Sequence, residues 1–102
     1  MLASMRESLI QIKTYSFAVR IIKLYKFLCE NKKEFVLSKQ LLRSGTVPFA
    51  LSYEAEHAQS RADFLSKINI ALKEANETKF WLFLLKDWIY LTNQEFSAII
   101  PD

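Results

Sequence analysis

The sequence predicts an all-α protein: an up-and-down antiparallel helical bundle of the four-helix type, with a short or truncated fourth helix. Three observations support this fold class. The 102 residues are the length of one domain, so we expect a single domain over residues 1–102. One glycine and two prolines leave few residues for the tight turns of an all-β fold, and 51% hydrophobic residues exclude disorder. Four helix-start patterns each precede an apolar run with helical spacing.

Each start pattern places a side-chain acceptor three residues before an acid, which satisfies free backbone amides at a helix N-terminus. The pairs are Ser4 with Glu7, Asn31 with Glu34, Ser60 with Asp63, and Thr92 with Glu95. They predict helices over about residues 4–30, 34–57 and 61–90. A two-turn stub then begins at Thr92 and is closed by Pro101.

The first helix carries residues, all but one of them apolar, at alternating spacings of four and three, which is the seam of a bundle helix. These residues are Ile10, Thr14, Phe17, Ile21, Leu24 and Leu28. The seam predicts that one face of this helix packs along a neighbour for most of its length.

The second helix contains Gly45 and Pro48 in its middle. A proline inside a helix removes one hydrogen bond, so we expect a kink or a break near Thr46. Small residues on the same helix would let a neighbour approach closely. They are Ser38, Ser44, Gly45, Ser52 and Ala55.

The third helix has a seam that is small in the middle, at Ala71 and Ala75, and large at both ends. This jigsaw predicts a helix at the centre of the bundle. Its C-terminal end, residues 80–91, is apolar nearly all round, so a subunit interface of a homo-oligomer is expected there. The alternative is a well-filled monomer core. The expected interface residues are Phe80, Trp81, Phe83, Trp88 and Tyr90.

Composition argues against most catalytic sites. One glycine and one cysteine exclude a P-loop, a dinucleotide fingerprint and a paired-cysteine metal motif. Glu54 and His57 form a Glu-x-x-His pair, but a di-iron site needs two such motifs and the chain has one histidine. Cys29 with His57 has no third orienting group, and Cys29 is better explained as a small buried hydrophobe. We expect no enzyme, metal or cofactor.

No membrane or export segment is predicted. Three charges within the first 13 residues interrupt any signal-peptide core. The densest apolar stretch, residues 80–91, is broken by Lys86 and Asp87 and is shorter than the roughly 20 residues that a span requires. The lone cysteine suits a reducing compartment, so a cytoplasmic location is expected.

The formal net charge of +3 lies entirely on the first helix, since the rest of the chain has nine bases and nine acids. A basic stripe on an exposed helix attracts polyanions, and the alternative is a merely solvated face. The candidate nucleic-acid contacts on this helix are Arg6, Lys13, Arg20, Lys23 and Lys26.

Three segments carry a family resemblance: "FAVRIIKLYKFL" from Phe17, "LSKQLLRSGT" from Leu37, and "AQSRADFLSKINIALKEANETKFWLFLL" from Ala58. They resemble the bacterial four-helix-bundle proteins of the 23S rRNA intervening-sequence family. The same fold family includes accessory variability proteins of diversity-generating retroelements. The resemblance implies a ring, commonly a homopentamer, without known enzymatic activity. It also implies RNA or DNA, and a reverse transcriptase or another protein, as partners.

On matched positions, the resemblance implies nucleic-acid contacts at Arg20, Lys23, Lys39 and Arg43, and structural acids at Glu54, Glu74 and Glu77. Two features depart from the family. Leu51 stands where many members have an asparagine, and Pro101 ends the fourth helix early. The expected function is therefore a non-catalytic bundle that binds RNA or DNA through its first helix. The alternative is a structural or protein-partner module that binds no nucleic acid.

Overall fold

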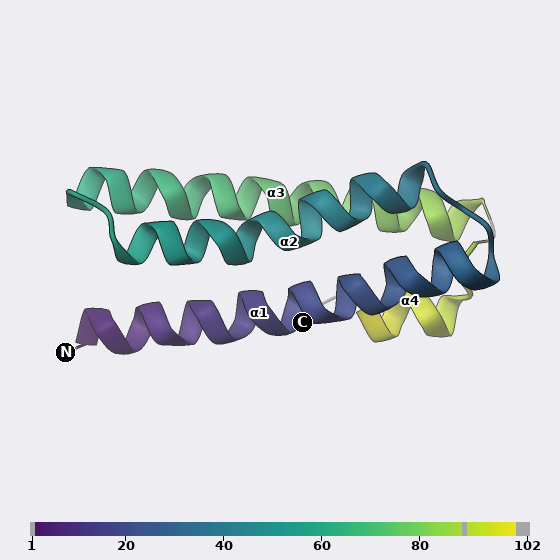
Figure 1. The fold of residues 1–102 in the computed structure, drawn as a ribbon, viewed down its shortest axis with the longest axis horizontal. Helices are drawn as coiled ribbons and strands as arrows, with labels where there is room; N and C mark the ends of the chain where they lie inside the picture. The colour runs from purple at the N-terminus through teal and green to yellow at the C-terminus, as the bar shows by residue number, and fades with distance from the viewer. Residues whose placement is uncertain (1, 89, 100–102) are drawn as a thin grey trace.

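The computed structural model describes residues 2–88 and 90–99, with side chains from residue 9 onward. It consists of α1 (Leu2–Asn31), α2 (Leu37–Glu56), α3 (Arg61–Asp87) and the short α4 (Asn93–Ile99), as Figure 1 shows. The described residues contain no strand. The predicted all-α fold with a short fourth helix is confirmed. The molecule measures 44 × 20 × 19 Å, and its length matches one 30-residue helix.

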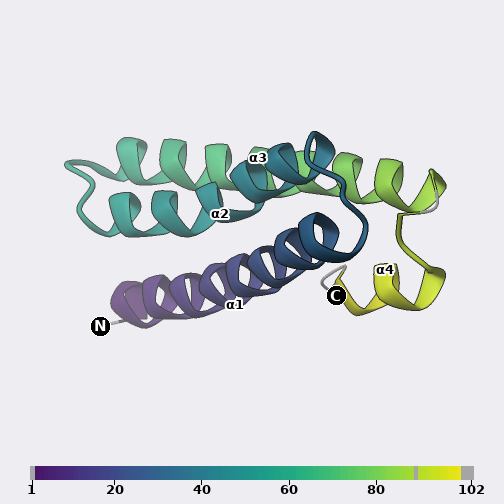
Figure 2. The same ribbon diagram turned by 45° about the vertical axis from the view of Figure 1, so that its right-hand side comes forward.

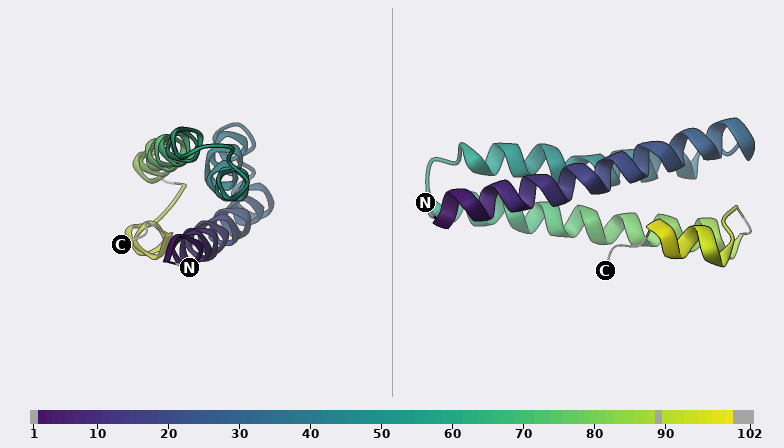
Figure 3. Two further views of the ribbon diagram at one scale, coloured as in Figure 1. Left: turned by 90° about the vertical axis from the view of Figure 1, so that its left-hand side faces the viewer. Right: turned by 90° about the horizontal axis from the view of Figure 1, so that it is seen from below.

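The three long helices alternate in direction along the long axis (Figures 1 and 2). Seen end-on in Figure 3, the four helices take the corners of a square, and α4 occupies the corner between α1 and α3. The central helix is α2, because it packs along both α1 and α3, whereas α1 and α3 make little direct contact. The prediction that the third helix is central is therefore wrong. Small residues on two sides of α2 allow α1 and α3 each to approach it closely.

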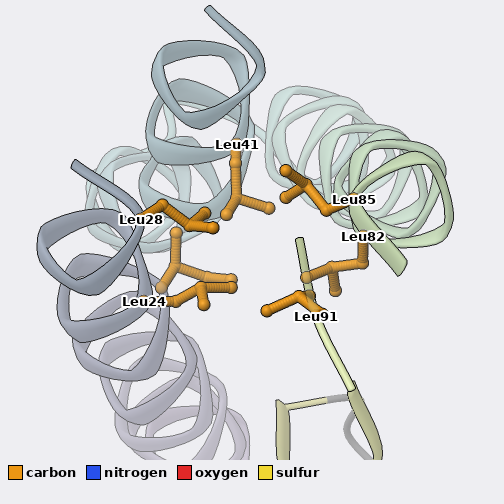
Figure 4. Close-up of a cluster of buried hydrophobic side chains, with 7 residues drawn as sticks. Leu24, Leu28, Leu41, Leu82, Leu85 and Leu91 are labelled. Atoms are coloured by element: carbon orange, nitrogen blue, oxygen red, sulfur yellow. The ribbon is translucent and has the colours of Figure 1, made fainter. Parts of the chain in front are cut away.

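The core lies at the end of the bundle where the α1–α2 and α3–α4 connections meet (Figure 4). Leucines from all three long helices converge there, and Leu91 inserts from the α3–α4 connection. The buried members are Ile21, Leu24, Leu28, Leu41, Leu82, Leu85 and Leu91. Of the seam predicted for the first helix, Ile21, Leu24 and Leu28 are buried in this core and Phe17 packs against it. The third helix contributes Leu82 and Leu85, whereas Ile89 lies outside the described residues.

The second helix begins at Leu37, three residues later than predicted. Asn31 is the last residue of α1 and does not cap α2. Instead, the buried carboxylate of Glu34 is the cap, with one oxygen accepting from the backbone N–H of Leu37 at 2.8 Å and the other from that of Ser38 at 2.7 Å. A negative charge at a helix N-terminus is favourable because the backbone amides there point outward.

The chain reverses between α1 and α2 through Lys33, whose φ of 53° lies in the left-handed region. The backbone N–H of Glu34 donates to the carbonyl of Leu28 at 3.0 Å, which ties the connection back to the last turn of α1. The chain thus uses a lysine where glycine is the usual residue. The chain reversal takes up residues 32–36, so α2 starts later than predicted.

Two other predicted starts are confirmed. The backbone N–H of Asp63 donates to the Ser60 hydroxyl at 3.0 Å. Thr92 and Glu95 form a reciprocal box, with backbone N–H to side-chain oxygen distances of 2.9 and 3.1 Å. The start predicted at Ser4 is wrong, because α1 is already helical from Leu2.

The second helix runs unbroken through Pro48, so of the predicted kink or break near Thr46 the break does not occur, and the kink stays a prediction. Pro48 has no backbone N–H, so the carbonyl of Ser44, four residues earlier, lacks its helical hydrogen-bond donor. Both residues are fully buried. Packing against α1 on one side and α3 on the other holds α2 together despite the missing hydrogen bond.

The third helix ends at Asp87, three residues before the predicted end at Tyr90. The backbone N–H groups of Tyr90 and Leu91 both donate to the carbonyl of Leu85, at 2.8 and 3.2 Å. This turn directs Leu91, which is 4% exposed, into the core. The apolar periodicity predicts one more helical turn at this point, but the chain instead leaves the helix and buries Leu91.

Candidate nucleic-acid interface

The C-terminal half of α1 presents Arg20, Lys23 and Lys26 as exposed side chains within two helical turns. Lys39 is exposed in the first turn of α2, which follows the chain reversal at the same end of the bundle (Figure 1). The structure therefore brings four of the seven predicted contacts to one region.

Lys32 and Lys33, also exposed, lie in the connection between these two helices. The predicted nucleic-acid contacts omit these two lysines, because the prediction summed charge over each helix and not over the connections. The "NKKE" run beside Lys26 is the signal that would have included them. Residues 20–39, named here the basic segment, carry six bases and two acids, so their surplus exceeds the +3 of the full chain. One of these acids, Glu34, is buried as the α2 cap.

The other predicted contacts lie elsewhere. The side chain of Arg6 is outside the described part of the structure. Lys13 lines a groove between α1 and α3, about two helical turns before Arg20. Arg43 is engaged by two carboxylates of α3: its guanidinium lies 3.1 Å from Glu74 Oε2 and 2.7 Å from Glu77 Oε1.

The hydrogen bond that Arg43 donates to Glu77 raises the pKa of Arg43, and the same bond, with help from Glu74, lowers the pKa of Glu77. A phosphate at Arg43 would have to displace both carboxylates. Among the described side chains, Arg43 is the only base in an ion pair, so the bases of the basic segment have no such competition.

The predicted interface residues at the end of α3 divide into two groups. Phe80, Phe83 and Trp88 are exposed, at 65%, 48% and 72%. Trp81 and Tyr90 pack against the core. The exposed group lies at the end of the bundle that holds the core, on and just after the last turns of α3 (Figure 1).

A second apolar surface, absent from the prediction, joins α1 to α2 at the opposite end. Tyr15 and Phe49 pack edge to face with centroids 5.2 Å apart, and Phe49 and Tyr53 do so at 5.1 Å. Ile12 and both tyrosines are more than half exposed, and a shallow depression of about 510 Å³ lies among these residues. Periodicity missed this surface because Tyr15 and Tyr53 fall on neither seam.

The remaining candidates for chemistry are not assembled into a site. Glu54 and His57 are both exposed, and the described residues contain no cluster of three or more potential metal ligands. Cys29 Sγ lies 3.8 Å from the Ser38 hydroxyl at the start of α2, whereas His57 follows the end of α2. The length of α2, about 30 Å, separates the two. Within the described residues, no helix combines the length and apolarity that crossing a membrane requires.

Comparison with known proteins identifies the family. The sequence pattern of the 23S rRNA-intervening sequence protein family matches residues 6–102. The chain belongs to this family. A crystal structure of a protein with unknown function from the S23 ribosomal protein family of Bacteroides thetaiotaomicron VPI-5482 is 56% identical, with a TM-score of 0.88. The alignment covers 91% of this chain and 83% of that chain. No curated protein matches the sequence.

In this member of the 23S rRNA-intervening sequence protein family, two of the three segments that carry the family resemblance meet in space. Arg43 of "LLRSGT" binds Glu74 and Glu77 of "ALKEANET", and the hydroxyl oxygens of Ser44 and Thr78 lie 2.9 Å apart. The arginine-serine-glycine sequence of this segment lies inside α2 and does not form a turn. These family residues join α2 to α3, which is a structural role.

Proposed function

We propose that this member of the 23S rRNA-intervening sequence protein family is a non-catalytic, ring-forming bundle that binds structured RNA through its basic segment. The observation that carries the proposal is the concentration of charge: residues 20–39 have six bases, all exposed, and one of their two acids is buried as a helix cap. Such a surface attracts the phosphate backbone without sequence preference.

RNA is favoured over DNA by the apolar residues beside these lysines. Phe35 and Val36, in the connection between α1 and α2, are 51% and 75% exposed. An exposed aromatic ring beside positive charge can stack on an unpaired base, and structured RNA offers such bases in its loops. Lys32 also lies over the ring of Phe27, 5.6 Å from its centroid, which keeps its charge near this surface.

Ring formation is supported by the two apolar surfaces, which lie on different helices and at opposite ends of the molecule. A surface that matched itself would give a closed dimer, whereas two different surfaces give a head-to-tail contact that can close into a ring. A ring would repeat the basic segment several times, so that weak individual attractions add.

The test is a salt titration with a fluorescent RNA hairpin that has an unpaired loop, measured by anisotropy, with a DNA duplex of equal length for comparison. The K23Q/K26Q variant should bind the hairpin several-fold more weakly, and its salt dependence should fall by roughly two phosphate contacts. The matched control is K67Q/K73Q, which removes the same charge from α3. Equal effects of the two variants, or no binding at low salt, would overturn the proposal.

The second candidate function is a protein-partner module, favoured by the exposure of Phe80 and Trp88. Neutralising Arg20 and Lys23 should weaken hairpin binding several-fold under the first function and leave protein binding intact under the second. Arg43 is left unchanged in this test, because its loss would also remove the ion pairs with Glu74 and Glu77.

A further inference from the structure

Two large apolar side chains are exposed in the middle of the basic segment's charge. Phe35 and Val36 lie in the connection between α1 and α2, at one end of the bundle (Figure 2), and are 51% and 75% exposed. Within the described structure, neither belongs to the leucine core or packs against it. Their apolar surfaces are therefore available to another molecule.

The backbone on both sides of Phe35 is held in place by hydrogen bonds. On one side, the backbone N–H of Glu34 donates to the carbonyl of Leu28 at 3.0 Å. On the other side, the backbone N–H of Val36 donates to the Glu34 carboxylate at 3.0 Å, and the Ser38 hydroxyl donates to the Glu34 carbonyl at 2.8 Å. The Phe35 backbone therefore needs little ordering on binding, which lowers the entropic cost of a contact with its ring.

The charges around this ring favour a polyanion. Lys33 and Lys39 are exposed, two residues before and four residues after Phe35. Lys32 is directed toward α1, where its ammonium group lies 5.6 Å from the centroid of the Phe27 ring. Two copies of the chain packed together at this connection would bring their lysines together, which like charges disfavour.

The combination of ring and lysines narrows the class of ligand. An isolated phosphate would satisfy the lysines and leave the ring of Phe35 in water. A continuous double helix would do the same, because its bases are stacked inside. An unpaired nucleotide supplies both contacts, since its base offers a flat face to the ring and the phosphates on its two sides attract the lysines.

We propose that Phe35 is the base-stacking residue of the RNA contact, and that Lys33 and Lys39 bind the phosphates that flank the stacked base. The ligand of this site is one unpaired nucleotide in a loop or bulge. Stacking tolerates all four bases, because each has a flat aromatic face. This inference rests on the proposed function and names the part of the RNA that the basic segment selects.

The test compares two fluorescent RNA hairpins with the same stem and the same number of phosphates. One hairpin carries bases in its loop, and in the other every loop nucleotide is abasic. The full chain should bind the first hairpin about tenfold more tightly, as one base stacked on an aromatic ring contributes. Phe35→Ala should remove this preference and leave the affinity for the abasic hairpin unchanged. Phe35→Trp should retain the preference.

Two control variants separate stacking from charge. Phe80→Ala removes an exposed ring from α3, outside the basic segment, and should leave the preference for the loop bases unchanged. K33Q/K39Q should weaken the binding of both hairpins by the same factor, so that the preference remains.

Equal binding of the two hairpins by the wild type, with affinity that still falls as salt rises, overturns this inference and leaves the proposed function intact. The inference is also overturned if Phe35→Ala keeps the preference. Dissociation of an oligomer by Phe35→Ala would assign the ring to a contact between copies and overturn it as well. If neither hairpin binds at low salt, the proposed function fails and this inference fails with it.

Discussion

Gly45 of α2 lies directly against Ile21 of α1: a Cβ atom on the glycine would lie 2.6 Å from Cγ1 and 2.7 Å from Cγ2 of the isoleucine. Ile21 is fully buried, so it has no free space into which to move. The glycine is needed here for close approach and not for a turn, since its φ is not positive. This contact sets how closely α1 and α2 pack.

Gly45→Ala should therefore destabilise the fold, although alanine is the better helix former. Overpacking costs about 1–3 kcal/mol, and the gain in helix propensity offsets only about 0.5–1 kcal/mol of that. Urea unfolding measures the loss. In the double variant I21A/G45A, the loss should be smaller than the sum of the two single losses, because the methyl group then has room. Additive losses would show that this contact does not limit the packing.

Glu34→Ala should lower stability by about 1–2 kcal/mol, because three backbone N–H groups at the start of α2 lose their acceptor. Thermal and urea unfolding measure the change. Glu30→Ala, which removes an exposed acid from the same end of the bundle, is the matched control and should change stability little. Similar losses in both variants would mean that charge, and not capping, is responsible.

Lys33→Gly should stabilise the protein by about 0.5–1 kcal/mol, because glycine adopts the left-handed conformation at this position without steric cost. Lys32→Gly removes the same charge one residue earlier and should bring no such gain. Differential scanning calorimetry of the two variants makes the comparison. A lower melting temperature for Lys33→Gly would contradict the predicted conformational relief.

The Arg43–Glu77 pair should make stability depend on pH. Because the folded protein lowers the pKa of Glu77, this pair contributes stability above the ordinary carboxyl value of 4.5 and loses it as pH falls through the folded pKa. Both side chains are partly exposed, so the effect at neutral pH should be about 1 kcal/mol or less.

The measurement compares urea midpoints of the wild type and Glu77→Gln at pH 7 and near pH 3. The difference between the two proteins should be larger at pH 7 and shrink in acid. Glu54→Gln, at an exposed position on α2, serves as control. A difference that stays constant with pH would assign the effect of Glu77→Gln to packing.

Head-to-tail assembly predicts the outcome of a mixing experiment. Tyr53→Asp disables the surface on α1 and α2, and Phe80→Asp disables the surface on α3, so each variant alone should be monomeric. Together they retain one intact contact between different copies and should form a dimer of one of each, detectable by light scattering. If the contact were between identical surfaces, the mixture would contain no such dimer.

The apolar seams of α1 and α3 could be predicted from the sequence because they depend on local spacing. The resemblance to the 23S rRNA-intervening sequence family could also be recognised from the sequence. Apolar residues at intervals of three and four lie on one face of a helix whatever surrounds it. The caps at Ser60 and Thr92 were also local, since each joins residues three apart. The Glu34 cap was missed because the chain reversal at Lys33 moves the helix start.

The sequence by itself determined the fold class, the helical segments and the excess of positive charge near the first helix. Only the tertiary structure decided that α2 is central, that Arg43 is held by Glu74 and Glu77, and that Tyr15 meets Phe49 across two helices. The physical reason is the distance along the chain over which each interaction acts. Periodicity and capping act within about one helical turn, whereas the choice of neighbour depends on which small residues allow two helices to approach, as Gly45 does for Ile21.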